Sequence, residues 1–306
     1  MTTLVVADTL DDTEREAVDS LLDAAATASG HPALPDAKRA ELSGAAPRTG
    51  FAVLARDGER LLGYGHALVP NPSGLWYVQA VIDPTGPDAE RDGLWTAIAE
   101  TAVAEAKARA ASAVRLWVFD AGPDDDRRVG ALGGAPARDL VQMRCDLPHP
   151  DAPNLPDDTT LRTFVAGQDE DEWLDVNRAA FGEHPEQGTF SRADLEARMG
   201  EPWFDPADFL ILDDAHGVAG FCWVKTIHAT DGRPGHGEIY VVAAHPRRQG
   251  EGLGRALTLA GLARMSEHGL PEARLYVDGG NAAAVSLYES LGFARHHVDR
   301  VYEVRG

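Results

Sequence analysis

The stretch HPRRQGEGLGRAL, residues 245–257, places three glycines within five positions and then continues directly into helix-forming residues. Glycine allows backbone N–H groups to come close to a ligand. The first turn of a helix adds N–H groups that have no partner within the helix, together with the positive end of the helix dipole. The stretch therefore predicts a loop and helix start that bind an anion, most often a phosphate group.

Two familiar phosphate-binding patterns do not fit this loop. A P-loop ends in G-K-[ST], whereas Gly254 is followed by arginine and alanine. The dinucleotide pattern G-x-G-x-x-G does not match the spacing of GEGLGR. What remains is Q-x-x-G-x-G over residues 249–254, flanked by Arg247, Arg248 and Arg255. These arginines either supply local positive charge to a phosphate or belong to an ordinary solvated surface loop.

Composition limits the class of protein and its partners. The chain has 306 residues, enough for two domains, and its 44% hydrophobic content favours folded globular domains. The formal net charge of −21 argues against nucleic acid as a partner, because proteins that bind nucleic acid present a basic surface. The same charge means that any phosphate site needs donors arranged locally.

The two cysteines, Cys145 and Cys222, lie in apolar runs typical of strands. Two cysteines without a CxxC pattern cannot build a disulfide framework. We interpret them as buried, reduced thiols, the alternative being a nucleophile. The sequence has no signal peptide and no run of about twenty apolar residues. We therefore expect a cytoplasmic protein without a membrane partner, and we expect it to be a monomer.

The chain repeats one order of elements on either side of a Pro- and Asp-rich segment, residues 148–159. In each half, two strands joined by a turn (51–69 and 209–227) precede an apolar strand that ends at a proline. A glycine turn, an amphipathic helix and a further strand follow in both halves. This repeat predicts two tandem mixed α/β domains, residues 1–147 and 160–306, each with a central sheet flanked by helices.

The second half carries a more specific combination of motifs. Downstream of the Q-x-x-G-x-G loop lies the strand LYVDGGN, and then the pattern N-x-x-A-x-x-x-Y-x-x-x-G-F over residues 281–293. Together these motifs resemble the GCN5-related N-acetyltransferase (GNAT) superfamily across the whole second half. The resemblance implies that acetyl-CoA is the co-substrate, and that backbone N–H groups of residues 249–255 hold its pyrophosphate.

Acetyl transfer from a thioester makes few chemical demands. The thioester is already activated, so an acceptor amine can attack it directly in a ternary complex. The amine must be neutral, which a base assists; the oxyanion needs a donor, and the departing thiolate benefits from a proton. Glu238 begins the strand that leads into the loop, and Tyr288 follows on the later helix. The resemblance implies that Glu238 is the general base and Tyr288 the general acid. Outside that context they would be an exposed strand-end acid and a core tyrosine.

The first half lacks these groups at the matching positions. Aligning the prolines at 84 and 246 places Trp76 opposite Glu238. Aligning the Gly-Leu pairs at 93–94 and 252–253 places Val129 opposite Tyr288. The same alignment places Glu90 at the start of the loop, where a carboxylate would repel pyrophosphate. We therefore predict that the first domain is degenerate and catalytically silent. If it still binds coenzyme A, the pantetheine contacts are the backbone of Ala80, Val81 and Ile82.

Further stretches look like the two-domain acetyltransferases of mycothiol biosynthesis: FGEHPEQGTF, EPWFDP, EIYVVAAHP and LYVDGGNAAAVSLYESLGF. Those enzymes acetylate the cysteinyl amine of desacetylmycothiol, a cysteine amide of glucosaminyl-inositol. Carboxylates suit such an acceptor, because they accept from its hydroxyls and attract its ammonium. The acceptor-binding residues that the resemblance implies are Asp36, Glu186, Lys225, Glu238 and Tyr276.

The resemblance also implies a set of residues for acetyl-CoA, spread over the strand before the loop, the loop itself and the start of the later helix. No metal ion is expected. The set is Val242, Ala243, Ala244, Gln249, Gly250, Glu251, Gly252, Leu253, Gly254, Arg255, Asn281, Ala282, Ala283, Ala284, Val285 and Ser286.

Two other functions stay open at this point. One is the same chemistry on another amine, such as an aminoglycoside, a polyamine or a peptide N-terminus, because acceptor choice lies in loops that motifs do not describe. The other is an acetyl-CoA sensor without turnover. The presence of both Glu238 and Tyr288 argues against the sensor.

Overall fold

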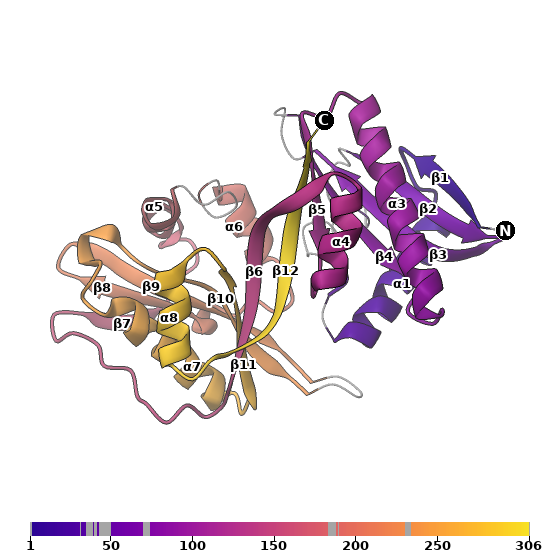
Figure 1. The fold of residues 1–306 in the computed structure, drawn as a ribbon. Helices are drawn as coiled ribbons and strands as arrows, with labels where there is room; N and C mark the ends of the chain where they lie inside the picture. Colours follow the sequence, from indigo (N-terminus) through magenta and orange to yellow (C-terminus); the bar gives the residue numbers. More distant parts are fainter. Residues whose placement is uncertain are drawn as a thin grey trace. The chain divides into compact units, whose positions relative to one another are not determined.

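The computed structural model describes residues 2–30, 32–34, 39, 42, 50–69, 74–182, 188, 190–229 and 234–305. The chain divides into two compact units, Met1–Leu140 with Val298–Gly306, and Val141–His297. In each unit a central sheet is flanked by helices (Figure 1). The expected pair of mixed α/β units is therefore confirmed.

The sheet of the first unit is antiparallel except at one pair of strands. Its order is β1-β2-β3-β4-β5, and the end of β12 pairs with β5. β4 and β5 are parallel, as a helix crossover between them requires. The strands are β1 (Thr3–Ala7), β2 (Gly50–Asp57), β3 (Arg60–Leu68), β4 (Leu75–Ile82), β5 (Ala113–Val118), β6 (Gly134–Asp146) and β12 (Ala294–Arg305).

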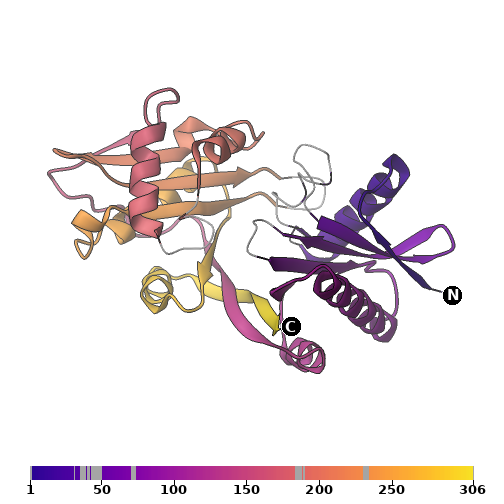
Figure 2. The same cartoon turned by 90° about the horizontal axis from the view of Figure 1, so that it is seen from above.

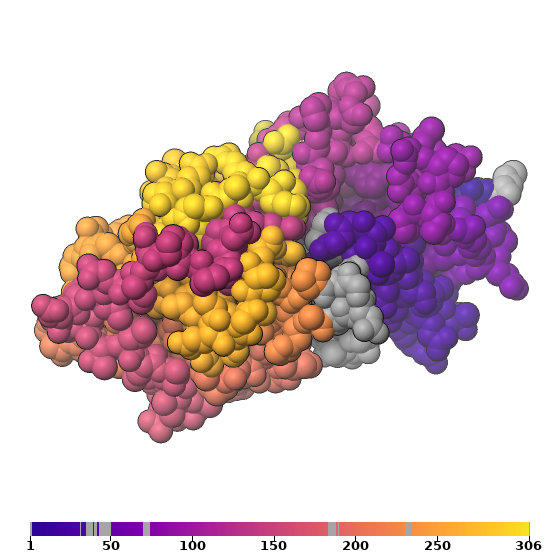
Figure 3. Space-filling model, turned by 90° about the horizontal axis from the view of Figure 1, so that it is seen from below, coloured from indigo at the N-terminus to yellow at the C-terminus, as the bar shows by residue number. Residues whose placement is uncertain are grey.

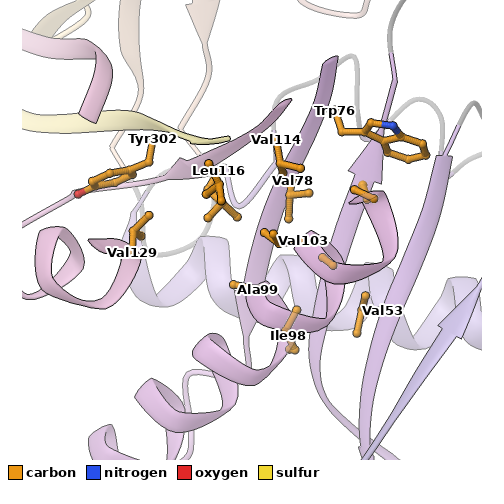
Figure 4. Packing of buried hydrophobic residues seen from close by; sticks show 14 of the residues in the cluster. Val53, Trp76, Val78, Ile98, Ala99, Val103, Val114, Leu116, Val129 and Tyr302 are labelled. Atoms are coloured by element: carbon orange, nitrogen blue, oxygen red, sulfur yellow. The ribbon is translucent and has the colours of Figure 1, made fainter. Parts of the chain in front are cut away.

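Helices cover both faces of this sheet. They are α1 (Asp12–Ser29), α3 (Asp88–Ala108) and α4 (Pro123–Ala131). Alternation along β2 sends Val53 to one face and Leu54 to the other. Val53 and Val78 pack in the same cluster as Ile98 of α3 (Figure 4). Leu54 packs in a second cluster with Leu22 of α1. The first unit thus has one core on each side of its sheet.

The second unit repeats this order of elements. Its sheet runs β7-β8-β9-β10-β11, with β6 next to β11. β7 to β10 pair in antiparallel fashion, and β10 and β11 are parallel. The strands are β7 (Thr160–Thr163), β8 (Phe209–Asp214), β9 (Gly217–Ile227), β10 (His236–Ala244) and β11 (Glu272–Asp278). The helices are α5 (Glu170–Phe181), α6 (Arg192–Met199), α7 (Leu253–Glu267) and α8 (Ala282–Ser290), with short 3-10 turns η2 (Pro206–Asp208) and η3 (Pro246–Arg248).

Helix α5 lies across one face of this sheet (Figure 2), and an aromatic core packs between them. Trp173 of α5 is fully buried and meets Phe209 edge-on at 5.5 Å, while Phe209 stacks on Trp223 at 4.4 Å. On the other face α7 approaches closely, since a Cβ added to Gly261 would lie 2.7 Å from the sulfur of Cys222. Cys222 and Cys145 are buried free thiols, and burial raises the pKa of each to about 12.

Two long strands contribute residues to both units. β6 belongs to the first unit up to Leu140 and to the second from Val141, while β12 passes from the second to the first at Val298. These divisions differ from the boundaries expected at 147 and 160, because the end of the chain completes the first unit. A sequence repeat cannot reveal this arrangement. Both halves of the sequence end in a similar strand, and the strand pattern does not indicate the sheet to which each of these strands belongs.

The segment at 148–159 lies on the second unit (Figure 3). His149 Nε2 donates to the Leu291 carbonyl oxygen at 3.0 Å. Asp151 pairs with Arg255 at 2.8 Å, and Asp158 with Arg248 at 3.2 Å. Within the described ranges, no helix is long and apolar enough to cross a membrane.

Candidate active site

In the second unit two parallel strands separate. β10 pairs with β11 only over Gly237–Ile239 and Ala273–Leu275, although both strands continue. The register of β10 with β9 shifts between Ile239 and Val241, which marks a bulge that bends β10. Beyond the bulge, β10 can offer backbone groups to an extended ligand, much as a sheet edge does to an added strand. This part of β10 contains Val242, Ala243 and Ala244.

The glycine-rich loop connects β10 to α7. Gly250 and Gly252 have φ values of +88° and +81°, a conformation that favours glycine. A Cβ added at either position would meet no protein atom within 4 Å, so backbone conformation rather than crowding requires glycine there. The Ala256 N–H bonds the Gly252 carbonyl oxygen at 3.1 Å, which closes the first turn of α7. The N–H groups of Leu253, Gly254 and Arg255 are the donors that a helix start leaves without an intrahelical partner, whereas those of Gln249 and Glu251 bond the Pro246 and Arg248 carbonyl oxygens.

The arginines of this loop are already engaged with carboxylates. Arg247 and Arg248 both contact Asp214, at 2.8 and 3.0 Å. Burial would raise the pKa of Asp214, but hydrogen bonds from the His216 N–H and from both arginines lower it to about 2. Arg248 also contacts Glu251 at 2.7 Å. The positive charge predicted for a phosphate is therefore largely neutralised, and the backbone N–H groups with the helix dipole are the remaining attraction for an anion.

A second helix begins beside the loop. The Asn281 side chain accepts from the Ala284 N–H at 3.1 Å and so caps the N-terminus of α8. The start of α7 lies against α8, since a Cβ added to Gly254 would be 3.6 Å from Leu287. Residues 282–286, expected to complete the acetyl-CoA site, form the first turns of α8.

Tyr288 lies further along α8 and is 9% exposed. Its ring meets Phe293 edge-on at 5.8 Å. Burial, with a smaller influence of Cys222, raises the pKa of Tyr288 to about 12, so the phenol keeps its proton at neutral pH. Among the described residues, none hydrogen-bonds the Tyr288 hydroxyl. The side chain is thus a buried, neutral phenol at neutral pH.

Glu238 lies between two cations on the neighbouring strands. It stands opposite Lys225 of β9 and opposite Arg274 of β11. Directly paired side chains on adjacent strands point to the same face of the sheet, so the three form a charged row. Glu238 is partly exposed.

Polar side chains continue this row toward β6. Arg274 Nε contacts Glu272 at 2.5 Å. The Gln142 amide of β6 donates to the Tyr276 hydroxyl at 2.6 Å, which ties that tyrosine to the network. Burial and then the Arg274 charge lower the pKa of His236 to about 4, so that imidazole is neutral. Lys225 and Glu238 thus lie opposite each other on β9 and β10, and Tyr276 lies two residues beyond Arg274 on the adjoining strand β11.

Residues that the motifs did not single out complete this region. Trp203 packs on Tyr240 at 5.2 Å between ring centres, and the Lys225 ammonium lies 5.0 Å from the Trp203 ring. Burial raises the pKa of Tyr240, which the nearby Arg198 opposes. The signal for Tyr240 was a large aromatic between short apolar residues in EIYVVAAHP. Nothing in the sequence placed Arg274 beside Glu238 or Trp203 beside Lys225, because these contacts depend on strand register and on packing between distant segments.

Asp36 and Glu186, both expected to contact the acceptor, lie outside the described residues. Within the part of the chain that the structure describes, no cluster of three or more His, Cys, Asp or Glu side chains is arranged to hold a metal ion.

The first unit has the same parting of strands but a different helix start. β4 and β5 pair over Leu75–Gln79 and Ala113–Trp117, and β4 continues through Ala80, Val81 and Ile82. Helix α3 begins at Asp88, close after Pro84, whereas α7 begins at Leu253 after the longer glycine loop. The first turn of α3 carries two acidic residues, Asp88 and Glu90. The longer glycine-rich loop of the second unit thus has no equivalent in the described residues between β4 and α3.

Comparison with known proteins agrees with this geometry. Residues 171–293 match the Acetyltransferase (GNAT) family. Two solved structures share the fold at a TM-score of 0.72: a GCN5-related N-acetyltransferase from Sphaerobacter thermophilus (21% identity, 99% of this chain and 96% of that one) and a tandem GNAT protein from the clavulanic acid biosynthesis pathway (18% identity, 100% and 98%). Fold and site together define an N-acetyltransferase of the GNAT class.

Sequence relatives narrow the class. A mycothiol acetyltransferase from Thermobispora bispora is 41% identical over 294 residues, covering 94% of this chain and 95% of the relative. Another from Streptomyces avermitilis is 40% identical, covering 94% and 91%. A third from Streptomyces coelicolor is 38% identical with the same coverage. The chain belongs to the mycothiol acetyltransferase family.

Proposed function

We infer that this chain transfers the acetyl group of acetyl-CoA to the cysteinyl amine of desacetylmycothiol, giving mycothiol by direct attack in a ternary complex. The observation that carries the inference is the 41% identity to a mycothiol acetyltransferase over 94% of the chain. The second unit supports it, because it contains a partly exposed carboxylate at Glu238, a buried phenol at Tyr288 and a glycine-rich helix start of the type that receives an anion.

Acetyl-CoA fits the features around β10. In this proposal its pantetheine arm pairs with the backbone of Val242, Ala243 and Ala244, where β10 has left β11. Its pyrophosphate meets the N–H groups of residues 249–255 at the start of α7. The first turns of α8, beginning at the Asn281 cap, form the adjoining wall. No metal ion is needed, since a thioester is already an activated acyl donor.

Glu238 acts as the general base. The cysteinyl amine of the acceptor is an ammonium ion until a base removes its proton, and only the neutral amine attacks the thioester carbonyl. Glu238 lies at the start of the separation of β10 and β11, where the acyl end of acetyl-CoA would lie. Backbone N–H groups of the diverging β10 edge are donors of the type that stabilise the tetrahedral oxyanion.

Tyr288 acts as the general acid toward the thiolate of coenzyme A. With a pKa of about 12 it is fully protonated at neutral pH. Complete transfer to a thiolate, whose ordinary pKa is about 8.5, is uphill. Tyr288 therefore stabilises the departing thiolate mainly through a hydrogen bond from its hydroxyl to the sulfur, which strengthens as the C–S bond breaks. The amine proton taken up by Glu238 balances the proton that the thiol finally gains.

The acceptor lies along the charged row in this proposal. Lys225 donates to acceptor oxygens, and the Tyr276 hydroxyl, held by Gln142, contacts the hydroxyl-rich part. Asp36 and Glu186 remain proposed acceptor contacts. An acceptor that carries one ammonium is also attracted by a chain with a net charge of −21.

We propose that the first unit is catalytically silent. Trp76 is 7% exposed and packs in the core beside Phe51, at the position that aligns with Glu238. The acidic first turn of α3 opposes a pyrophosphate. Only the backbone of Ala80, Val81 and Ile82 is then left to hold part of a coenzyme A molecule.

A thiol-release assay tests the function. Acetyl-CoA is combined with desacetylmycothiol and, separately, with aminoglycosides, polyamines and peptides. We expect a strong preference for desacetylmycothiol. Turnover with another amine alone would keep the mechanism and reject this acceptor. Coenzyme A binding without turnover on any amine would instead support a sensor.

A further inference from the structure

Trp203 covers the lysine beside the proposed base. The Lys225 ammonium lies 5.0 Å from the centre of the Trp203 ring, within the range at which an indole face attracts a cation. The indole is itself held by two rings, Tyr240 at 5.2 Å and Trp223 at 5.6 Å. Tyr240 and Trp223 belong to β10 and β9, the strands of Glu238 and Lys225.

The segment that carries Trp203 is anchored by a buried carboxylate. The side chain of Asp208 is only 2% exposed, and it accepts from Thr226 Oγ1 at 2.9 Å, Arg264 Nε at 2.7 Å and His268 Nε2 at 2.7 Å. Thr226 adjoins Lys225 on β9, and the other two donors belong to the end of α7. The anchor therefore fixes the Trp203 segment to the strand of Lys225.

Lys225 needs such a support. A lysine side chain has four flexible methylene groups, and ordering it costs conformational entropy. Lys225 stands directly opposite Glu238 in the β9–β10 register, so its ammonium is a candidate donor to an acceptor bound at that base. Stacking on an indole restricts the stem without removing the three N–H donors.

We propose that Trp203 is a positioning residue for the acceptor. It holds the Lys225 ammonium in the charged row, and so sets acceptor affinity without contacting acetyl-CoA. The identity of the acceptor in this inference rests on the proposed function. The contact between Trp203 and Lys225 is independent of that function.

Kinetics of two variants test the acceptor effect. We expect Trp203→Leu to raise the KM for desacetylmycothiol roughly 3-fold to 30-fold, the range that a cation–π contact supports, and Trp203→Phe to raise it less. The KM for acetyl-CoA should stay within about 2-fold, because only the acceptor contact is lost. Trp95→Leu is the matched control, since Arg128 lies 5.1 Å from the Trp95 ring in the first unit. Equal rises in both KM values for Trp203→Leu would overturn the proposal.

A double-mutant cycle tests whether Trp203 acts through Lys225. If it does, Trp203→Leu has little further effect on the acceptor KM in a Lys225→Met background. Independent, additive effects of the two changes would show that Trp203 serves only the packing of the unit, and would reject the positioning role.

The lysine itself gives a readout that needs no acceptor. The chain has three lysines, Lys38, Lys107 and Lys225, so reductive ¹³C-methylation, which keeps the charge, yields few NMR signals. Lys225→Arg assigns the Lys225 signal. We expect the ring current of the indole to change the chemical shift of that signal, and Trp203→Leu to remove this change. An unchanged signal overturns the proposal even if desacetylmycothiol is turned over. If only another amine is turned over, the function fails, and the same KM comparison with that amine decides this proposal.

Discussion

Single side chains acquire their chemistry here from what surrounds them. Tyr288 remains a proton donor because burial raises its pKa to about 12, and His236 is neutral because burial and Arg274 lower its pKa to about 4. Glu238 is partly exposed between Lys225 and Arg274. The motifs indicated the residue types at 238 and 288. They could not indicate the burial and the cross-strand neighbours, which come from residues distant in sequence.

Replacing Glu238 by glutamine tests the base. The amide keeps the shape but cannot take a proton at neutral pH, so we expect kcat to fall at least about 10-fold. The dissociation constant of coenzyme A, measured by calorimetry, should hardly change. Glu303→Gln in the first unit is the control. If kcat and coenzyme A affinity fall together, Glu238 has a structural role.

Replacing Tyr288 by phenylalanine tests the acid through pH. Because the pKa of Tyr288 is raised, its phenol stays protonated well above pH 10, where an ordinary tyrosine would ionise. We expect the variant to have a lower kcat but a pH profile parallel to that of the wild type between about pH 7 and 10. A loss of wild-type activity on the alkaline side that is missing from the variant would contradict this assignment.

At the scale of elements, short departures from regular structure build the site. The bulge after Ile239 turns β10 away from β11, and two glycines with positive φ connect β10 to α7. The glycine pattern predicted the loop and the helix start correctly. The parting of the strands was not predictable, because strand patterns describe alternation along one strand and not where a neighbouring ladder ends.

Two glycines at opposite ends of one helix test the loop. Gly252 precedes α7 and Gly269 follows it; both have positive φ, +81° and +70°, and an added Cβ meets nothing within 4 Å at either. Valine should therefore strain both positions similarly. We expect Gly252→Val alone to weaken coenzyme A binding, by at least about 10-fold, since it blocks backbone donors to a charged group. Equal affinities in the two variants would remove this loop from the proposed site.

At the scale of the whole molecule, the strands β6 and β12 each contribute residues to both units. Tyr302, near the end of the chain, is fully buried in the core of the first unit and donates to Asp126 at 2.7 Å. The repeat in the sequence predicted two similar domains, and two compact units are observed. Assignment of the last strand required the tertiary structure, because pairing between distant segments leaves no local signal.

Replacing Tyr302 by alanine tests this assignment. A cavity of that size costs about 3–5 kcal/mol of unfolding free energy, and we expect the loss to fall on the first unit. Hydrogen exchange should then show reduced protection in β5 and α4, with α7 and β10 retained. Arg305→Ala, on the same strand but exposed, is the control. Lost protection confined to the second unit would refute the division of the chain.

The sequence by itself determined the class of protein, the tandem repeat, the phosphate-type loop and the candidate pair Glu238 and Tyr288. Each of these depends on local spacing or on glycine conformation, which a linear pattern can express. The tertiary structure decided that Asp214 neutralises the loop arginines, that Lys225 and Arg274 flank Glu238, and that Trp203 covers Lys225. Those relations depend on register and packing between segments far apart in the chain, and no local pattern encodes them.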